Sequence, residues 1–284
     1  MLQEQTLFGI EDKVQNSINA LRSFEPPEGY YVAFSGGKDS VVVKALCDMA
    51  GVKYDAHYNV TSVDPPELVT FIKQCYPEVQ REIPHDSDGK PMTMWNIIPK
   101  KQMPPTRLAR YCCELLKERS GIGRICVTGV RWAESARRKN KQSLVNIFGG
   151  IMLNNDNDES REVLESCYRN KKTLLNPIIN WEDEDVWQFI KENKIPYCGL
   201  YDKGYTRLGC IGCPMNTKAA EELEKYPKYK QMYLKAFDKM LKVREEKGLK
   251  TEWKTAEEVM DWWLNRKSGK QLDGQMEINI DAFG

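Results

Sequence analysis

The sequence of 284 residues predicts an α/β fold with a doubly wound, mostly parallel sheet and a C-terminal helical subdomain. In the first part of the chain, short apolar runs rich in β-branched and aromatic residues alternate with segments of helical spacing. Residues 218–266 are instead dominated by helix formers. We therefore predict an α/β domain over residues 1–217, followed by a helical subdomain and tail over residues 218–284.

The first predicted strand, helix and strand follow one another without long gaps. Residues 29–34 form a short β-rich run, and residues 40–49 place apolar side chains at helical spacing. Alternation of this kind is typical of parallel sheets with crossover helices. Further strands are predicted at residues 53–60, 79–83, 124–130 and 176–179, with helices at 66–75 and 182–192.

Three polar stretches interrupt this pattern. Residues 86–106 are rich in Pro, Gly and Met, which predicts a long loop with at most one short helix around Trp95. The polar run at residues 151–160 predicts a mobile turn or hairpin tip. Residues 271–284 are expected to form a tail.

Composition limits the classes of partner. Lys plus Arg (42) and Asp plus Glu (41) nearly cancel, which argues against tight nonspecific binding of nucleic acid and leaves a local basic patch open. The N-terminus has no basic start followed by an apolar core, and no stretch approaches eighteen apolar residues. We expect a cytoplasmic protein without a membrane partner. An oligomer is compatible with the sequence.

Nine cysteines in an intracellular chain are more typical of metal ligands, redox groups or core residues than of a disulfide framework. Five are isolated in apolar or mixed segments and are expected to be small buried hydrophobes. These are Cys47, Cys75, Cys126, Cys167 and Cys198.

A glycine pair lies between the first predicted strand and its helix. Glycines there let the backbone turn sharply and direct successive N–H groups at one anion, at the positive end of the helix dipole. The spacing differs from that of a Walker A loop. The alternative is a simple strand-to-helix turn with a solvated Lys-Asp pair. The predicted nucleotide-binding residues are Ser35, Gly36, Gly37, Lys38, Asp39 and Ser40.

A second polar turn follows the predicted strand at residues 124–130. Because the carboxyl ends of parallel strands line the ligand crevice, Gly129, Arg131 and one of Arg137 and Arg138 are expected to face bound phosphates or sulfate. The alternative is a polar helix start with exposed basic residues.

Four cysteines form an adjacent pair and a Cys-x-x-Cys, namely Cys112, Cys113, Cys210 and Cys213. Four thiolates suit either tetrahedral zinc or an iron–sulfur cluster. Two adjacent cysteines reach a single zinc only with strain, which favours a 4Fe-4S cluster. The alternative is a set of unligated cysteines. Lys117, one helical turn from Cys113, is either near the cluster and substrate or a solvated helix lysine.

The motifs resemble a known superfamily. The hexapeptide SGGKDS at residues 35–40 resembles the signature of the PP-loop superfamily, whose members generally bind ATP and release pyrophosphate by adenylating a substrate. TGVRWAESARR at 128–138 resembles the matching segment of the phosphoadenosine phosphosulfate reductase family. Residues 63–67 and 197–205 are similar to that family's nucleotide-edge loop and to the loop before its second cysteine pair.

The resemblance covers residues 28–217, with the motifs in family order. The cysteine pattern resembles the adenylyl-sulfate reductase branch, where the two pairs hold a 4Fe-4S cluster beside the nucleotide. One feature departs from that branch. Its reductases attack the sulfate with a cysteine on a C-terminal segment, and no cysteine follows Cys213 in this sequence.

Three functions follow. The first is an ATP-using sulfurtransferase or thiolation enzyme, in which Mg²⁺ helps to neutralise pyrophosphate and sulfur from a donor protein or small thiol displaces AMP. Its acceptor would be a nucleic acid or a small molecule. The second is a reductase that converts adenylyl sulfate, or its 3′-phosphorylated form, to sulfite with an external thiol. The third is a non-catalytic nucleotide- or redox-sensing module. The predicted catalytic residues are Lys38, Asp39, Lys117 and Arg131.

Overall fold

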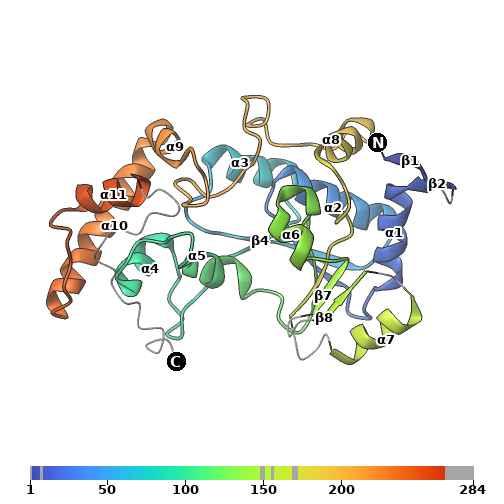
Figure 1. Ribbon diagram of the computed structural model, residues 1–284, viewed down its shortest axis with the longest axis horizontal. Helices are drawn as coiled ribbons and strands as arrows, with labels where there is room; N and C mark the ends of the chain where they lie inside the picture. The colour runs from blue at the N-terminus through green and yellow to red at the C-terminus, as the bar shows by residue number, and fades with distance from the viewer. Residues whose placement is uncertain (1, 7–8, 148–150, 155–156, 168–171, 266–284) are drawn as a thin grey trace.

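The computed structural model describes residues 2–6, 9–147, 151–154, 157–167 and 172–265. Its centre is a seven-stranded sheet with the strand order β5-β4-β3-β6-β9-β7-β8 (Figure 1). The strands are β3 (Tyr30–Ala33), β4 (Tyr54–Asn59), β5 (Gln80–Glu82), β6 (Ile125–Val127), β7 (Val145–Ile147), β8 (Ile151–Leu153) and β9 (Thr173–Leu175).

Most of the sheet is parallel, as predicted. β3 pairs in parallel with β4 and with β6, so that Val32 lies opposite both Ala56 and Val127. β5 and β9 extend the parallel part on either side, whereas β7 is antiparallel to both β9 and β8. The α/β class with a mostly parallel sheet is confirmed.

Chain segments cover both faces of the sheet. On one face, the Tyr30 hydroxyl donates to the Leu21 carbonyl of α1 (Lys13–Ser23) at 2.6 Å. Helix α2 (Lys38–Ala50) packs against α1 and against α8 (Asp183–Glu192). On the other face, the thiol of Cys126 donates to the Gly121 carbonyl at 3.3 Å. This covering of both faces is the doubly wound arrangement.

The predicted strand at residues 176–179 is wrong. β9 ends at Leu175, and the following residues form a turn in which the Ile179 N–H donates to the Asn176 carbonyl at 3.1 Å. Asn176 is fully buried, and its amide donates to the Ser143 carbonyl at 2.8 Å. Pro177 has no N–H to offer a ladder, so the strand ends before it.

The prediction of a turn at residues 151–160 is also wrong. Residues 151–153 are β8, and α7 (Asp158–Cys167) begins within the same stretch. Three residues are too few for a periodic signal, and pairing with β7 decides their conformation. The N-terminal hairpin of β1 (Gln3–Thr6) and β2 (Gly9–Asp12) was not predicted either.

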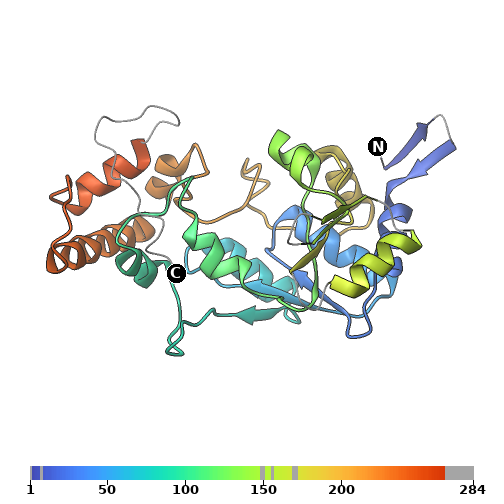
Figure 2. The same cartoon turned by 60° about the horizontal axis from the view of Figure 1, so that its bottom comes forward.

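A second hydrophobic core lies beside the sheet domain. It joins α4 (Met94–Lys101), the predicted short helix around Trp95, to the C-terminal helices. Tyr233 is central: its ring lies 5.0 Å from Trp95 and 4.8 Å from Trp263. Figure 2 places the C-terminal helices at the end of the molecule opposite the N-terminal hairpin. They are α9 (Ala219–Lys225), α10 (Pro227–Glu246) and α11 (Ala256–Asn265).

The second core contains residues from both sides of the predicted boundary at residue 217, and that boundary stays a prediction. The predicted tail at 271–284 lies outside the described residues. Among the described helices, none has the length and apolarity needed to cross a membrane.

The isolated cysteines are mostly placed as predicted. Cys47, Cys126 and Cys198 are buried. Cys75 is exposed, because it is the last residue of α3 (Pro66–Cys75), so its predicted burial is wrong. The side chain of Cys167 lies outside the described ones.

Replacement of Phe237 by alanine should destabilise the second core. Phe237 is fully buried and its ring packs edge-on at 5.5 Å from Trp263. A cavity of this size typically costs about 3–5 kcal/mol. Urea denaturation should show this loss, whereas Met232→Ala, an exposed position on the same helix, should change the free energy of unfolding by less than about 0.5 kcal/mol. Equal effects of the two substitutions would contradict this packing.

Candidate nucleotide site and cysteine site

The predicted phosphate loop lies at the carboxyl end of β3 and leads into α2. Gly36 has φ +73°, and an added Cβ would lie 2.7 Å from the Ile72 side chain, so both the conformation and the space require glycine. Gly37 is the N-cap of α2. Within the loop, the Ser40 hydroxyl donates to the Gly37 carbonyl at 2.8 Å. Ser35 accepts from the Gly37 N–H at 3.4 Å.

Lys38 is buried at the start of α2. Its ammonium group lies 2.9 Å from a carboxylate oxygen of Asp183 and 3.3 Å from one of Asp39. Its backbone N–H donates to the Tyr201 hydroxyl at 2.9 Å. This N–H belongs to the first turn of the helix, where no intrahelical partner exists.

Arg131 connects three segments at the same point. Its guanidinium donates from Nε to Asp39 at 2.7 Å, from Nη2 to Asp183 at 2.5 Å and from Nη1 to the Trp181 carbonyl at 3.1 Å. The side chain is almost completely buried. The structure therefore brings together Lys38, Asp39 and Arg131 as predicted and adds Asp183.

These contacts keep the groups ionised. Burial would raise the pKa of Asp183, but hydrogen bonds from Lys38 and Arg131 outweigh it and lower that pKa below its usual value. Burial would likewise lower the pKa of Arg131, and the charges of Asp39 and Asp183 raise it instead. Asp183 and Arg131 therefore both carry their charge at neutral pH.

Gly129 lies against the phosphate loop. An added Cβ would meet the Cβ of Asp39 at 2.9 Å and its carbonyl carbon at 3.0 Å. The φ angle of Gly129 is not positive, so the requirement is close approach between the two loops. This contact fixes the distance between the end of β6 and α2.

Arg138, and not Arg137, is oriented toward the site. Arg138 is half-buried, pairs with Glu134, and its pKa is lowered first by burial and then by the charge of Arg207. Asp39, Arg131 and Arg110 are also close enough to act on it. Arg137 is exposed on α6 (Ala136–Lys141).

The four predicted cysteine ligands come from two segments. Cys112 and Cys113 form the short helix α5 (Tyr111–Cys113), which continues into a π-helix at Glu114–Glu118. Cys210 and Cys213 close a turn in which the Cys213 N–H donates to the Cys210 carbonyl at 3.2 Å. The Cys112 thiol is close enough to both Cys210 and Cys213 for their charges to act on it, so the two pairs face each other.

Cations surround these thiols. Arg110 donates to the Cys113 thiol at 3.3 Å. A hydrogen bond from Cys112, followed by Arg110 and Lys117, lowers the pKa of Cys113 to about 5. The charge of the Cys210 thiol raises the pKa of Lys117. Lys117 is therefore beside the cysteines, as the first of its two predicted roles requires.

Among the residues that the structure describes, no three His, Cys, Asp or Glu side chains form a group that could hold a metal ion. The donor type still suits a thiolate-bound cluster, because two pairs of cysteines lie on facing segments beside Arg110 and Lys117, which favour the ionised form of Cys113. The carboxylate of Asp64 lies beside these cysteines, with its Oδ1 4.0 Å from the Sγ of Cys210.

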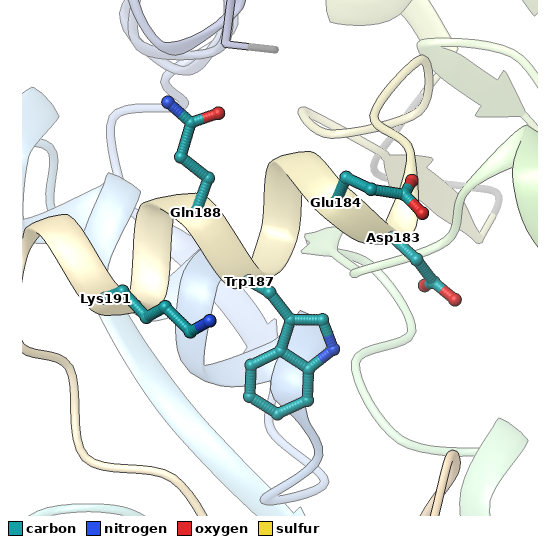
Figure 3. Close-up of a pocket in the computed structure, with 5 residues that line it drawn as sticks. All are labelled: Asp183, Glu184, Trp187, Gln188 and Lys191. Carbon is teal, nitrogen blue, oxygen red and sulfur yellow. The ribbon is translucent and has the colours of Figure 1, made fainter.

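Two residues at the nucleotide site were missed in the sequence. Asp183 was included only as part of a helix start, and Tyr201 only as part of a loop that resembles the family. Both belong to one surface. Trp187 packs at 5.1 Å from Tyr201, and Figure 3 shows Trp187 and Asp183 pointing to the same side of α8. The hollow along this helix is lined by Asp183, Glu184, Trp187, Gln188 and Lys191.

The fold and the glycine loop before α2 are those of the PP-loop class. The family model of the phosphoadenosine phosphosulfate reductase domain matches residues 29–216. The chain therefore belongs to the phosphoadenosine phosphosulfate reductase family. Its relatives include an adenosine 5′-phosphosulfate reductase of Staphylococcus haemolyticus, which is 23% identical over 56% of this chain and 56% of its own length.

Similarity to individual proteins is low or local. An uncharacterized protein of Methanocaldococcus jannaschii is 26% identical over 218 residues, which are 73% of this chain and 40% of that protein. A probable FAD synthase of Schizosaccharomyces pombe is 25% identical over 73% of this chain and 69% of its own length. The adenosine 5′-phosphosulfate reductase of Oceanobacillus iheyensis is 47% identical over 45 residues, 16% of this chain and 19% of the reductase.

The chain spans less than half the length of the M. jannaschii relatives that it matches. Among solved structures, the phosphoadenylyl-sulfate reductase of Candida auris in its phosphate complex is 16% identical. The superposition covers 70% of this chain and 89% of the reductase chain, with a TM-score of 0.47.

Replacement of Gly129 by alanine should displace Asp39 and weaken nucleotide binding at least about tenfold, because the new methyl group meets backbone atoms that cannot move independently. Isothermal titration with ATP would measure the effect. Gly209→Ala is the matched control, since nothing lies within 4 Å of its added Cβ and its φ is not positive. Unchanged ATP affinity in the Gly129 variant would contradict the close approach.

Proposed function

We propose that this protein binds ATP at the Ser35–Ser40 loop, adenylates an acceptor with release of pyrophosphate, and transfers sulfur to that acceptor as AMP leaves. The observation that carries the proposal is the convergence of two buried cations, Lys38 and Arg131, on the N-terminus of a thirteen-residue helix. Helix N-termini with glycine loops bind phosphates, and buried cations strengthen that binding.

The residues of the loop have distinct parts in this reaction. The Lys38 N–H at the start of α2 would exchange the Tyr201 hydroxyl for the phosphates that leave, and the Lys38 ammonium group would exchange its contact with Asp183 for one with pyrophosphate. Arg131, held on both sides by Asp39 and Asp183, would keep its orientation as charge develops. Asp39 and Asp183 would hold Mg²⁺, which supplies further neutralisation of the pyrophosphate.

Cys112, Cys113, Cys210 and Cys213 would hold the 4Fe-4S cluster, with zinc as the alternative occupant. The cluster would carry or deliver sulfur, or act electrostatically on the nucleotide. Arg110 and Lys117 would stabilise the negative charge of the thiolates. Sulfur itself would come from a donor protein or a small thiol.

A second candidate is reduction of adenylyl sulfate to sulfite. The 47% identity to an adenosine 5′-phosphosulfate reductase over 45 residues favours it. The thiol would come from another molecule or from one of the isolated cysteines of this chain, and Cys198 is poorly placed for this role because it is only 1% exposed.

One experiment separates the two candidates. The protein is purified anaerobically, its iron, sulfide and zinc are quantified, and it is incubated in parallel with ATP–Mg²⁺ and with adenylyl sulfate plus dithiothreitol. Pyrophosphate release from ATP is the expected result. Sulfite release without pyrophosphate would make the protein a reductase.

Lys38→Ala should lower pyrophosphate release at least about 100-fold, because it removes a charge that stabilises the leaving group. The fold should persist, since the side chain of the abandoned partner Asp183 is 62% exposed and can be hydrated. Circular dichroism checks the fold, and Lys53→Ala, an exposed lysine outside the loop, is the control. Turnover at the level of the unaltered protein would remove Lys38 from the site.

Cys213→Ser should lower bound iron and destabilise the protein, because a serine hydroxyl is a poor ligand for iron in a sulfur cluster. Iron per chain, measured after anaerobic purification, is the readout. Cys75→Ser, an exposed cysteine on α3, is the matched control and should retain the iron of the unaltered protein. Full iron content in the Cys213 variant would exclude this residue as a ligand.

A further inference from the structure

Positive charge is concentrated on three segments that border the two sites. These segments are residues 101–110, 131–141 and 203–218, and together they hold eleven Lys and Arg residues but one Asp or Glu residue. The whole chain has 42 Lys and Arg and 41 Asp and Glu residues, so the rest of the chain has 31 basic and 40 acidic residues. We refer to these three segments as the basic face. The near-neutral total charge therefore results from a basic face on an otherwise acidic protein.

Contacts around the cysteines hold the segments of the basic face together. Arg107 donates from Nε to the Pro214 carbonyl at 3.0 Å, which joins the first segment to the third. Arg110 binds the Cys113 thiol. Arg138, in the second segment, lies near both Arg110 and Arg207. Like charges are therefore gathered along one path from α6 to the cysteines.

Few of these cations are neutralised by the protein. On α6, Arg138 pairs with Glu134, whereas Arg137, Lys139 and Lys141 are exposed and have no carboxylate partner within the described part of the chain. Gathering unpaired like charges opposes folding unless a bound anion compensates for them. The proposed function assigns Lys38 and Arg131 to the phosphates of ATP, so the remaining cations exceed what a mononucleotide requires.

We propose that the acceptor at this site is a nucleic acid whose phosphodiester backbone lies along the basic face. The inference rests on the proposed function, because it names the acceptor of that reaction. Five arginines contribute, and the planar guanidinium matches the geometry of phosphate oxygens better than an ammonium does. An acceptor with several phosphates can pair with more of these cations than a small acceptor can. These arginines are Arg107, Arg110, Arg137, Arg138 and Arg207.

The test measures binding of fluorescein-labelled 20-nucleotide single-stranded DNA, single-stranded RNA and duplex DNA by fluorescence anisotropy between 50 and 200 mM salt. The variant Arg137→Gln/Lys139→Gln/Lys141→Gln removes three cations from α6. The control Lys235→Gln/Lys239→Gln/Lys247→Gln removes three exposed cations from α10 and its C-cap, in the C-terminal helical part away from α6 (Figure 1). Both variants have the same net charge.

At least one of the three nucleic acids should bind, with affinity that falls as salt rises. The α6 variant should bind it at least about tenfold more weakly at 100 mM salt, and the slope of log affinity against log salt should be smaller by about 2 for a single strand. The α10 variant should stay within about twofold of the unaltered protein. The three arms identify whether DNA or RNA is bound.

Three results would overturn the inference: no binding by the unaltered protein, equal losses in the two variants, or polyglutamate binding as tight as that of the nucleic acids. The last would indicate an acidic protein as the partner. Pyrophosphate release from ATP is measured separately for each variant. Binding of nucleic acid without pyrophosphate release would contradict the proposed adenylation and support the basic face as the nucleic-acid site. Pyrophosphate release without binding of nucleic acid would support the adenylation and contradict the role of the basic face.

Discussion

The geometry of the nucleotide site depends on the buried guanidinium of Arg131. It lies at the end of β6 and binds one carboxylate from the start of α2 and another from the start of α8. Three segments that are far apart in sequence are thereby fixed around one point. A buried cation of this kind is stable only with its partners in place, so the contacts of Asp39 and Asp183 also determine where Lys38 lies.

The cysteine site belongs to the second hydrophobic core, against which Cys112 and Cys210 pack. Cys210 follows the sheet domain, and the next residue, Ile211, donates its N–H to the Val63 carbonyl at 2.7 Å. Gly212 accepts no larger residue without strain, since φ is +70° and an added Cβ would lie 3.2 Å from Tyr233 and Trp263. The helical part therefore positions the second cysteine pair, which gives it a role in the site as well as in stability.

Local patterns in the sequence were sufficient for β3, β4, β5 and β6 and for the loop between β3 and α2, because each depends on contiguous residues: apolar runs for the strands, and two glycines followed by a helix for the loop. Asp183 and Tyr201 were missed because their partner Lys38 is 145 and 163 residues away. β7 and β8 were missed because their conformation depends on antiparallel pairing with each other and with β9. The strand predicted at residues 176–179 is absent because the buried amide of Asn176 donates to the carbonyl of Ser143, a partner that no local pattern specifies.

The most direct test of the account is a crystal structure of the protein with a non-hydrolysable ATP analogue and Mg²⁺. The account predicts that the β- and γ-phosphates lie at the N-terminus of α2, that Lys38 has left Asp183 for a phosphate oxygen, and that Arg131 keeps its contact with Asp39. The N–H of Lys38, now bound to Tyr201, should face the phosphates. Phosphates bound elsewhere, with the Lys38–Asp183 pair unchanged, would contradict it.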